Sequence, residues 1–154
     1  LLATDHALAL ARAKALDVSR RHRGRWVLGA DQTLDAADHP GVKAANRAEA
    51  QIFLKALSGR RHQLHSAAAI ARDGVILFET IESAMLEMRT LNDAFIACYL
   101  DRTGDESMSS VGGYQIEAIG LHLFERVDGD HNVIVGLPLL PLLSFLRRIG
   151  AVAS

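Results

Sequence analysis

The sequence predicts an α/β fold in which a mixed β-sheet is flanked by helices. Segments with helical periodicity alternate with segments rich in β-formers along the 154 residues. The dipeptide Asp73-Gly74 joins two such β-rich segments and predicts an antiparallel hairpin, which excludes an all-parallel sheet. The length and a hydrophobic content of 49% suit one core, so we expect residues 1–154 to form a single domain.

The N-terminal part contains one predicted helix and one short predicted strand. Alanine and leucine recur at helical spacing from Asp5 to about Asp17. A basic stretch then leads into the apolar run 26–28, which is typical of a buried strand and ends at Gly29-Ala30-Asp31. Residues 32–45 are predicted to be loop.

The middle of the chain gives the clearest helix and the hairpin. Asn46 followed by Glu49 resembles a capping box, and Gly59 stands where a helix C-terminal cap belongs. The strands of the hairpin are predicted over 62–71 and 75–88. His62 and His65 lie three apart on the first strand and therefore point to opposite faces, which favours structural roles over a shared metal.

Another helix is predicted from a Thr90 cap, with Asp93 three residues later, to near Asp101. Its predicted apolar face consists of Leu91, Phe95, Cys98 and Tyr99. Cys98 is therefore expected to be a buried packing residue.

The C-terminal part completes the predicted sheet. Strands are expected at 114–116 and 121–127, and Pro138 is expected to open a last helix that reaches about Ile149. The leucine-rich stretch 139–146 is predicted to be a core helix, with a homodimer interface as the alternative use.

Composition limits the possible partners and the compartment. Seventeen basic and eighteen acidic residues leave a net charge of -1, so we expect no nucleic-acid partner. No apolar run approaches the roughly 20 residues that span a bilayer, so we expect no membrane. A single cysteine forms no intrachain disulfide, which favours a reducing, cytoplasmic setting.

The first candidate for chemistry is Asp31, because open α/β sheets bind ligands just beyond the carboxyl ends of their strands. Lys43 lies downstream in the same predicted loop, with Thr33 and Asp35 between them. Carboxylate, hydroxyl and ammonium groups together can hold a metal-bound polyphosphate. Taken alone, the same residues also fit a turn-capping aspartate on a solvated loop.

Five segments in order resemble the Maf family, with similar spacing. They are GADQT (29–33), Lys43, ALSGRRHQLHSA (56–67), SSVGGYQIEAIG (109–120) and GDHNVIVGLPL (129–139). Upstream, Leu10 to Ala15 is similar to the family segment that carries a Lys-Ala pair. The similarity extends from about Ala7 to Leu146.

The resemblance implies a fold related to the inosine triphosphatase group, with a nucleotide cleft between two lobes. It implies a pyrophosphatase that cleaves non-standard or modified nucleoside triphosphates to the monophosphate and diphosphate, with Mg²⁺ or Mn²⁺ as cofactor. The alternative is a catalytically silent nucleotide-binding regulator linked to septum formation. A plain protein-interaction domain is a third interpretation and predicts no nucleotide binding.

The resemblance also assigns roles to residues. Asp31 matches the general base and, beside a metal, is a candidate ligand, with Glu117 as a second carboxylate. Lys14 and Lys43 match two lysines near the phosphates. Gln32 and Glu117 match positions that tune base selectivity, the second being normally a glutamine.

Several family features are missing or altered. The opening strand and helix, with the Ser-Pro-Arg-Arg loop that grips phosphate, have no counterpart. We expect an N-terminally incomplete chain in preference to a real loss, because a sheet without its first strand exposes an unpaired edge. Lys43-Ala44 replaces the family Lys-Pro, and a serine replaces a lysine within 109–112. Glu117 accepts hydrogen bonds but donates none, so the preferred base stays open.

Overall fold

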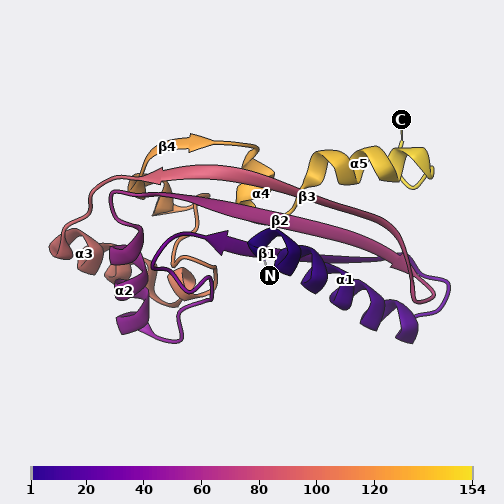
Figure 1. Ribbon diagram of the computed structural model, residues 1–154, viewed down its shortest axis with the longest axis horizontal. Coiled ribbons are helices and arrows are strands. Elements are labelled where there is room, and N and C mark those ends of the chain that lie inside the picture. The colour runs from indigo at the N-terminus through magenta and orange to yellow at the C-terminus, as the bar shows by residue number, and fades with distance from the viewer. Residues whose placement is uncertain (1, 154) are drawn as a thin grey trace. The chain divides into compact units, whose positions relative to one another are not determined.

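The computed structural model describes residues 2–153 (Figure 1). It contains one four-stranded sheet, ordered β1-β2-β3-β4, whose neighbouring strands run in opposite directions. The last pair has an antiparallel register in which Met85 faces Asp128 and Leu86 faces Val127. The predicted α/β class, with helices flanking a sheet that is not all-parallel, is confirmed. The strands are β1 (Val27–Asp35), β2 (Arg61–Arg72), β3 (Val75–Met88) and β4 (Phe124–Asp128).

The chain folds into two compact units. Unit 1 takes residues 2–32, 65–83 and 130–153, and unit 2 takes 33–64 and 84–129. The helices of unit 1 are α1 (Ala3–Arg21), α4 (His131–Val135) and α5 (Leu139–Arg148). Those of unit 2 are α2 (Arg47–Leu57), α3 (Asp93–Thr103) and the 3-10 helices η1 (Gly104–Met108) and η2 (Ile119–Leu123). Within the described residues, none of the helices has the length and apolar character needed to cross a bilayer.

Unit 1 has helices on both faces of its part of the sheet. Fully buried alanines every four residues along α1 meet fully buried alanines at alternate positions of β2. Ile70 points to the opposite face, where Leu142 and Phe145 of α5 cover it. The predicted use of α5 as a core helix is thus confirmed. The alanines are Ala7, Ala11 and Ala15 on α1 and Ala67, Ala69 and Ala71 on β2.

Unit 2 follows its predicted start signals closely. The Asn46 side chain accepts a hydrogen bond from the Glu49 amide at 3.0 Å, and Gly59 has the positive φ of 68° that favours glycine. In unit 1, the hairpin turn is also as predicted, because Asp73 and Gly74 both have positive φ. The cap of α3 is Asn92, which accepts from the Phe95 amide at 2.8 Å, and not Thr90.

Three predicted boundaries are wrong. The first strand continues to Asp35 because Thr33 and Leu34 are buried, so Asp31 lies within β1 and not beyond its end. The segment 114–116 is not a strand, although Tyr114 and Ile116 are both buried. The strand predicted over 121–127 starts only at Phe124, because η2 occupies the preceding residues. The five-residue helix α4 was not predicted.

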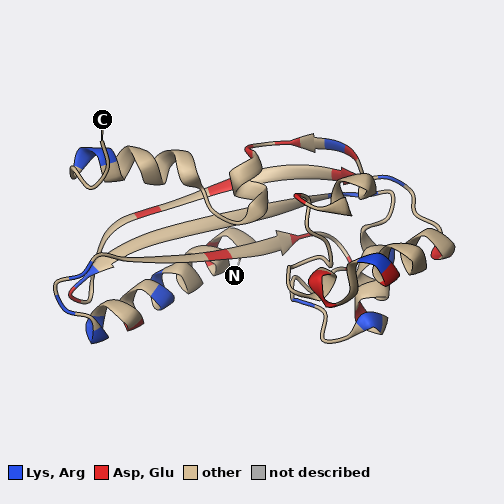
Figure 2. Cartoon of the chain, turned by 180° about the vertical axis from the view of Figure 1, so that it is seen from behind, with Lys and Arg blue, Asp and Glu red and all other residues tan. Residues whose placement is uncertain are grey.

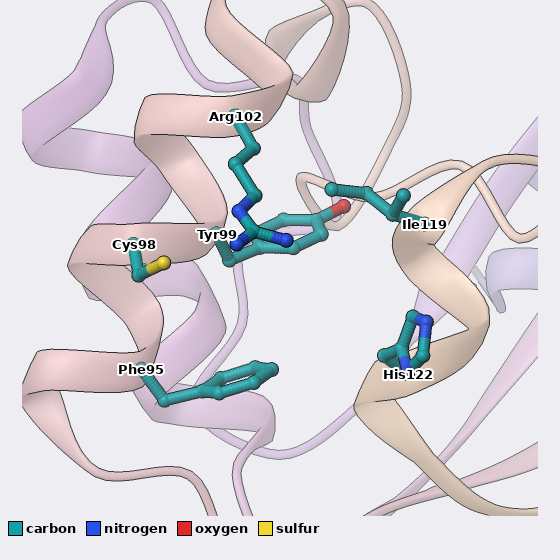
Figure 3. Close-up of a pocket in the computed structure, with 6 residues that line it drawn as sticks. All are labelled: Phe95, Cys98, Tyr99, Arg102, Ile119 and His122. Atoms are coloured by element: carbon teal, nitrogen blue, oxygen red, sulfur yellow. The ribbon is translucent and has the colours of Figure 1, made fainter.

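The predicted burial of Cys98 is also wrong. The buried residues of α3 are Ile96, Tyr99 and Leu100, so the core-facing side of the helix is turned away from Cys98. The Cys98 thiol is exposed and lines a hollow of about 220 Å³ between α3 and η2, shown in Figure 3. Arg102 and His122 line the same hollow.

Candidate active site

Two of the predicted site residues form an ion pair. Lys14, on α1, reaches β1, where its ammonium group contacts the Asp31 carboxylate and also donates to the Ala30 carbonyl at 3.1 Å. The Asp31 side chain is only 15% exposed, whereas that of Lys14 is 54% exposed. The structure therefore places a shielded carboxylate beside a cation that solvent can reach.

The close approach of α1 to β1 depends on the absence of a side chain at Gly29. A Cβ atom built at Gly29 would lie 2.4 Å from the Ala11 carbonyl oxygen and 2.6 Å from the Ala15 amide nitrogen. No side chain fits at such distances. Glycine on the strand and alanine on the helix therefore let the two backbones come close enough for Lys14 to meet Asp31.

One oxygen of the Asp31 carboxylate is open to chemistry. Oδ1 is engaged by Lys14, and Oδ2 has no hydrogen-bond or ion-pair partner among residues 2–153. An ionised carboxylate oxygen accepts protons, hydrogen bonds and cations. The arrangement can accept a proton from a water molecule, or bind a divalent cation, without first breaking the contact with Lys14.

Gln32, the neighbour of Asp31, is held by hydrogen bonds to β2 and α4. Its amide nitrogen lies 3.0 Å from the Ser66 hydroxyl and 3.0 and 2.9 Å from the Val133 and Ile134 carbonyls of α4. Ser66 itself donates to the Val133 carbonyl at 2.6 Å. Since the amide nitrogen has only two protons, it is fully committed, and Gln32 offers a ligand only its acceptor oxygen.

Ser66 and Gly29 lie inside segments that the sequence analysis had matched to the family, yet neither had been assigned a role. Ser66 is fully buried on β2 and joins this strand to α4 through its hydroxyl. The spacing of the α1 and β2 alanines was the available signal, because two small-residue faces predict close packing. No local pattern predicts the hydrogen bonds of Ser66, which join residues 67 positions apart.

The other two predicted residues, Lys43 and Glu117, belong to unit 2 and are exposed. Lys43 pairs with Val111 in an isolated antiparallel bridge, which brings its loop to the segment 109–112. Two segments that resemble one family in sequence, 60 or more residues apart, are thus neighbours within unit 2. Thr33 and Asp35, the other predicted polar residues of the loop, lie on the last part of β1.

The loop that carries Glu117 is tightly folded. The Gln115 side chain donates to the Ser109 hydroxyl at 2.7 Å. The backbone carbonyl of Gln115 accepts from the Ala118 amide at 3.2 Å. A Cβ atom at Gly120 would lie 2.2 Å from that same carbonyl oxygen, so this position also requires glycine. The loop presents the Glu117 carboxylate to solvent from a defined backbone.

A buried histidine lies beneath this loop. His62 Nε2 lies 2.7 Å from the Tyr114 hydroxyl, and burial lowers the pKa of His62 to about 4, with a smaller contribution from His39. His65, three residues further along β2, lies in unit 1 with Nδ1 2.6 Å from the Ser83 hydroxyl. Each imidazole thus has its own polar partner, as the structural interpretation predicted.

For a divalent metal, the residues of this site offer the Asp31 carboxylate as a ligand. Among the residues that the structure describes, no three His, Cys, Asp or Glu side chains gather as a metal-binding cluster. Mg²⁺ commonly keeps several waters and is held by one or two carboxylates together with substrate phosphates. The free oxygen of Asp31 is a ligand of this kind.

Known proteins are similar to this chain over most of its length. The family model described as Maf-like protein matches residues 2–149. A protein of Rhodopseudomonas palustris (strain HaA2) named nucleoside triphosphate pyrophosphatase is 55% identical over 141 residues, which are 92% of this chain and 70% of the relative. A protein of Bradyrhizobium diazoefficiens with the same name is 51% identical over 97% of this chain and 74% of its own length. A protein of Mesorhizobium japonicum named 7-methyl-GTP pyrophosphatase is 50% identical over 96% of this chain and 74% of its own length.

Proposed function

Because this chain belongs to the Maf-like protein family, we propose that it is a nucleoside triphosphate pyrophosphatase, which releases diphosphate and a nucleoside monophosphate. The observation that carries the proposal is the Lys14–Asp31 pair. It combines a shielded carboxylate, which can activate water, with a cation suited to a polyphosphate. The names of the relatives agree with the activity that the resemblance implied.

In this proposal, Asp31 is the general base. Its free oxygen takes a proton from the water molecule that attacks the α-phosphorus, and the bond to the departing diphosphate breaks. Lys14 holds the carboxylate in place and, being half exposed, also offers N–H groups to the phosphate oxygens. Lys43 supplies a second ammonium group for the phosphates.

Base selectivity is proposed for Gln32 and Glu117. The Gln32 amide nitrogen is committed to the backbone of α4, and a glutamate carboxylate carries no proton to donate, so both side chains offer acceptors only. Acceptors favour bases that present N–H groups, and the base edge of guanine presents N1–H and N2–H₂ together. We therefore expect guanine-type nucleotides, including the 7-methylated form, to be preferred.

A divalent cation, Mg²⁺ or Mn²⁺, is proposed as cofactor, and the family resemblance offers Asp31 of unit 1 as its ligand, with Glu117 of unit 2 as the further candidate. When bound, the metal would neutralise charge on the triphosphate and orient it for attack. The setting proposed for this activity is the cytoplasm, since an exposed free thiol such as that of Cys98 persists most easily in a reducing compartment.

The experiment that tests the proposal is a product analysis over a panel of triphosphates that includes GTP, 7-methyl-GTP, ATP and UTP, with Mg²⁺ or Mn²⁺ and with a chelator. We expect monophosphate and diphosphate in equal amounts, the highest rates with guanine bases, and loss of turnover with the chelator. Release of orthophosphate and nucleoside diphosphate would contradict the proposed bond cleavage. Nucleotide binding without turnover would instead favour a silent regulator.

A further inference from the structure

The net charge of -1 conceals an uneven distribution. Unit 1 has nine Lys and Arg against seven Asp and Glu, whereas unit 2 has eight against eleven. Half of the fourteen arginines lie at one end of unit 1, where α1, the β2–β3 turn and α5 end, and where blue gathers in Figure 2. This arginine tip consists of Arg20, Arg21, Arg23, Arg25, Arg72, Arg147 and Arg148.

The charge of the arginine tip is mostly unpaired. Arg21 pairs with Asp17 on the same helix, and Arg72 lies 3.8 Å from Asp73. The other five arginines have no carboxylate partner among residues 2–153. Arg20 and Arg23 also line an open hollow of about 280 Å³ at the hairpin turn, together with Asp73, whose carboxylate accepts a hydrogen bond from the Gly24 amide.

The backbone beneath these arginines is held in place. The Gly24 amide donates to the Asp73 carboxylate at 2.7 Å, and the Gly74 amide donates to the Ser19 hydroxyl at 3.1 Å. These two bonds join the end of α1 and the following loop to the hairpin turn. The arginines of α1, of the following loop and of the hairpin turn therefore project from segments that are held together.

A row of planar groups crosses the arginine tip. Arg72 lies over the Trp26 ring at 5.4 Å, Trp26 meets the edge of Phe145 at 6.2 Å, and Arg148 lies over Phe145 at 5.7 Å. Trp26, the only tryptophan of the sequence, is 45% exposed. Two guanidinium planes and a half-exposed indole are thus available to stack on planar ligands.

We propose that the arginine tip binds single-stranded nucleic acid. The phosphodiester backbone would pair with the unpaired guanidinium groups, whose planar forks match phosphate, and the bases would stack along the row from Arg72 to Arg148. The tip contains no lysine, which agrees with bidentate phosphate recognition. An acidic polypeptide would satisfy the charge but leave the planar row unused.

The position of Trp26 makes the proposal directly measurable. Its fluorescence reports on the arginine tip alone, since no other tryptophan is present. Titration with a ten-nucleotide oligouridylate at low salt is expected to quench this fluorescence saturably. The logarithm of the affinity should fall linearly with the logarithm of the salt concentration, by about 0.7 for each phosphate contacted.

The arginines are tested with the double variant Arg23→Gln/Arg25→Gln, which removes two of the unpaired guanidinium groups, and the anisotropy of a labelled oligouridylate. The salt slope should become shallower by about 1.4, because two phosphate contacts are lost. The matched control is Arg102→Gln/Arg126→Gln, which removes the same charge from exposed positions of unit 2 and should leave the slope unchanged. Triphosphate turnover should be unaffected in both double variants, so failure here would not disprove the pyrophosphatase proposal. Unchanged melting temperatures confirm that both variants are folded.

Three outcomes would overturn the proposal. One is the absence of binding at low salt, and another is equal loss of affinity in the two double variants. The third is equal or tighter binding of a probe that lacks bases: inorganic polyphosphate, poly-glutamate or phosphatidylserine vesicles, each at matched charge. In that case the arginine tip recognises charge alone, or a protein or membrane partner, and not single-stranded nucleic acid.

Discussion

Helices α1 and α2 differ in how they use side chains. In unit 1, α1 contacts the sheet through alanines and beside Gly29, so it buries little area per residue but brings two backbones close together. In unit 2, α2 buries Phe53, Leu54 and Leu57, which remove far more apolar surface from water. The difference indicates that the contact of α1 with the sheet matters more for positioning side chains than for stability. It sets the distance between Lys14 and Asp31, and a substitution there should affect activity out of proportion to folding.

The largest loss of stability is expected in unit 2. Leu54 is fully buried on α2, so Leu54→Ala should lower the free energy of unfolding by about 2–5 kcal/mol. Chemical denaturation measures this loss. Turnover per folded molecule should stay near the parent value, because the variant leaves α1 and β1 intact. A large loss of turnover in the folded fraction would show that α2 also positions the site, which contradicts the difference drawn between α1 and α2.

Acid should also weaken unit 2, through His62. Its pKa of about 4 in the folded protein lies below the unfolded value of 6.5, because burial penalises the charged ring. The unfolded chain therefore binds the proton first, and stability is lost as the pH falls from about 6.5 to about 4. The total loss is about 3 kcal/mol, from about 1.4 kcal/mol per pKa unit.

Thermal melts between pH 7.5 and pH 4.5 measure this loss, with His62→Gln as the test variant and His122→Gln as the control on an exposed histidine. The test variant should show a flatter pH dependence than the parent. An unchanged dependence would assign the acid sensitivity to other groups.

Gly29→Ala tests the close contact in unit 1. The added methyl group meets the backbone of Ala11, which is not free to move as a side chain would be, so about 1–3 kcal/mol of stability should be lost. The loss of kcat/KM in the folded protein should exceed tenfold, because α1 moves and takes Lys14 away from Asp31.

A suitable control for Gly29→Ala is Ala9→Val, which adds bulk to the exposed side of α1. That variant should retain activity. If Gly29→Ala also retained full activity, the distance between the two backbones would not be what positions the pair.

The smallest expected effect concerns helix capping, which differs between α1 and α3. The N-cap of α1, Leu2, makes no side-chain hydrogen bond, whereas Asn92 caps α3. Asn92→Ala should cost about 1 kcal/mol in denaturant unfolding. Thr90→Ala should lower the free energy of unfolding by less. If Thr90→Ala were instead the more destabilising change, Thr90 would be the cap, as the sequence analysis predicted.

The sequence predicted most of the fold, because many of its signals are local. The Asn46 cap, the Asp73-Gly74 turn and the helix after Pro138 all depend on residues within a few positions. Predictions failed where tertiary contacts decide. Asp31 lies within a longer strand because Thr33 and Leu34 find buried partners, and the core side of α3 turns away from Cys98. The family was recognised from five segments in order, and the comparisons confirm it.

The candidate site could be predicted only in part. Resemblance selected Lys14 and Asp31, and the structure shows that they touch. Neither periodicity nor spacing could show that Gln32 commits its amide nitrogen to α4, because Val133 and Ile134 lie about a hundred residues away. The role of Gly29 likewise follows from a helix and a strand that meet only in the folded chain.

The most direct test of the central claim is the rate of diphosphate release by Asp31→Asn, measured with the best triphosphate of the panel. The control is Asp17→Asn, which removes one carboxylate from the exposed side of α1. If the Lys14–Asp31 pair carries the chemistry, Asp31→Asn should lose at least about a hundredfold in kcat, as loss of a general base implies, while Asp17→Asn stays near the parent rate. A folded Asp31→Asn protein that releases diphosphate at the parent rate would contradict the account.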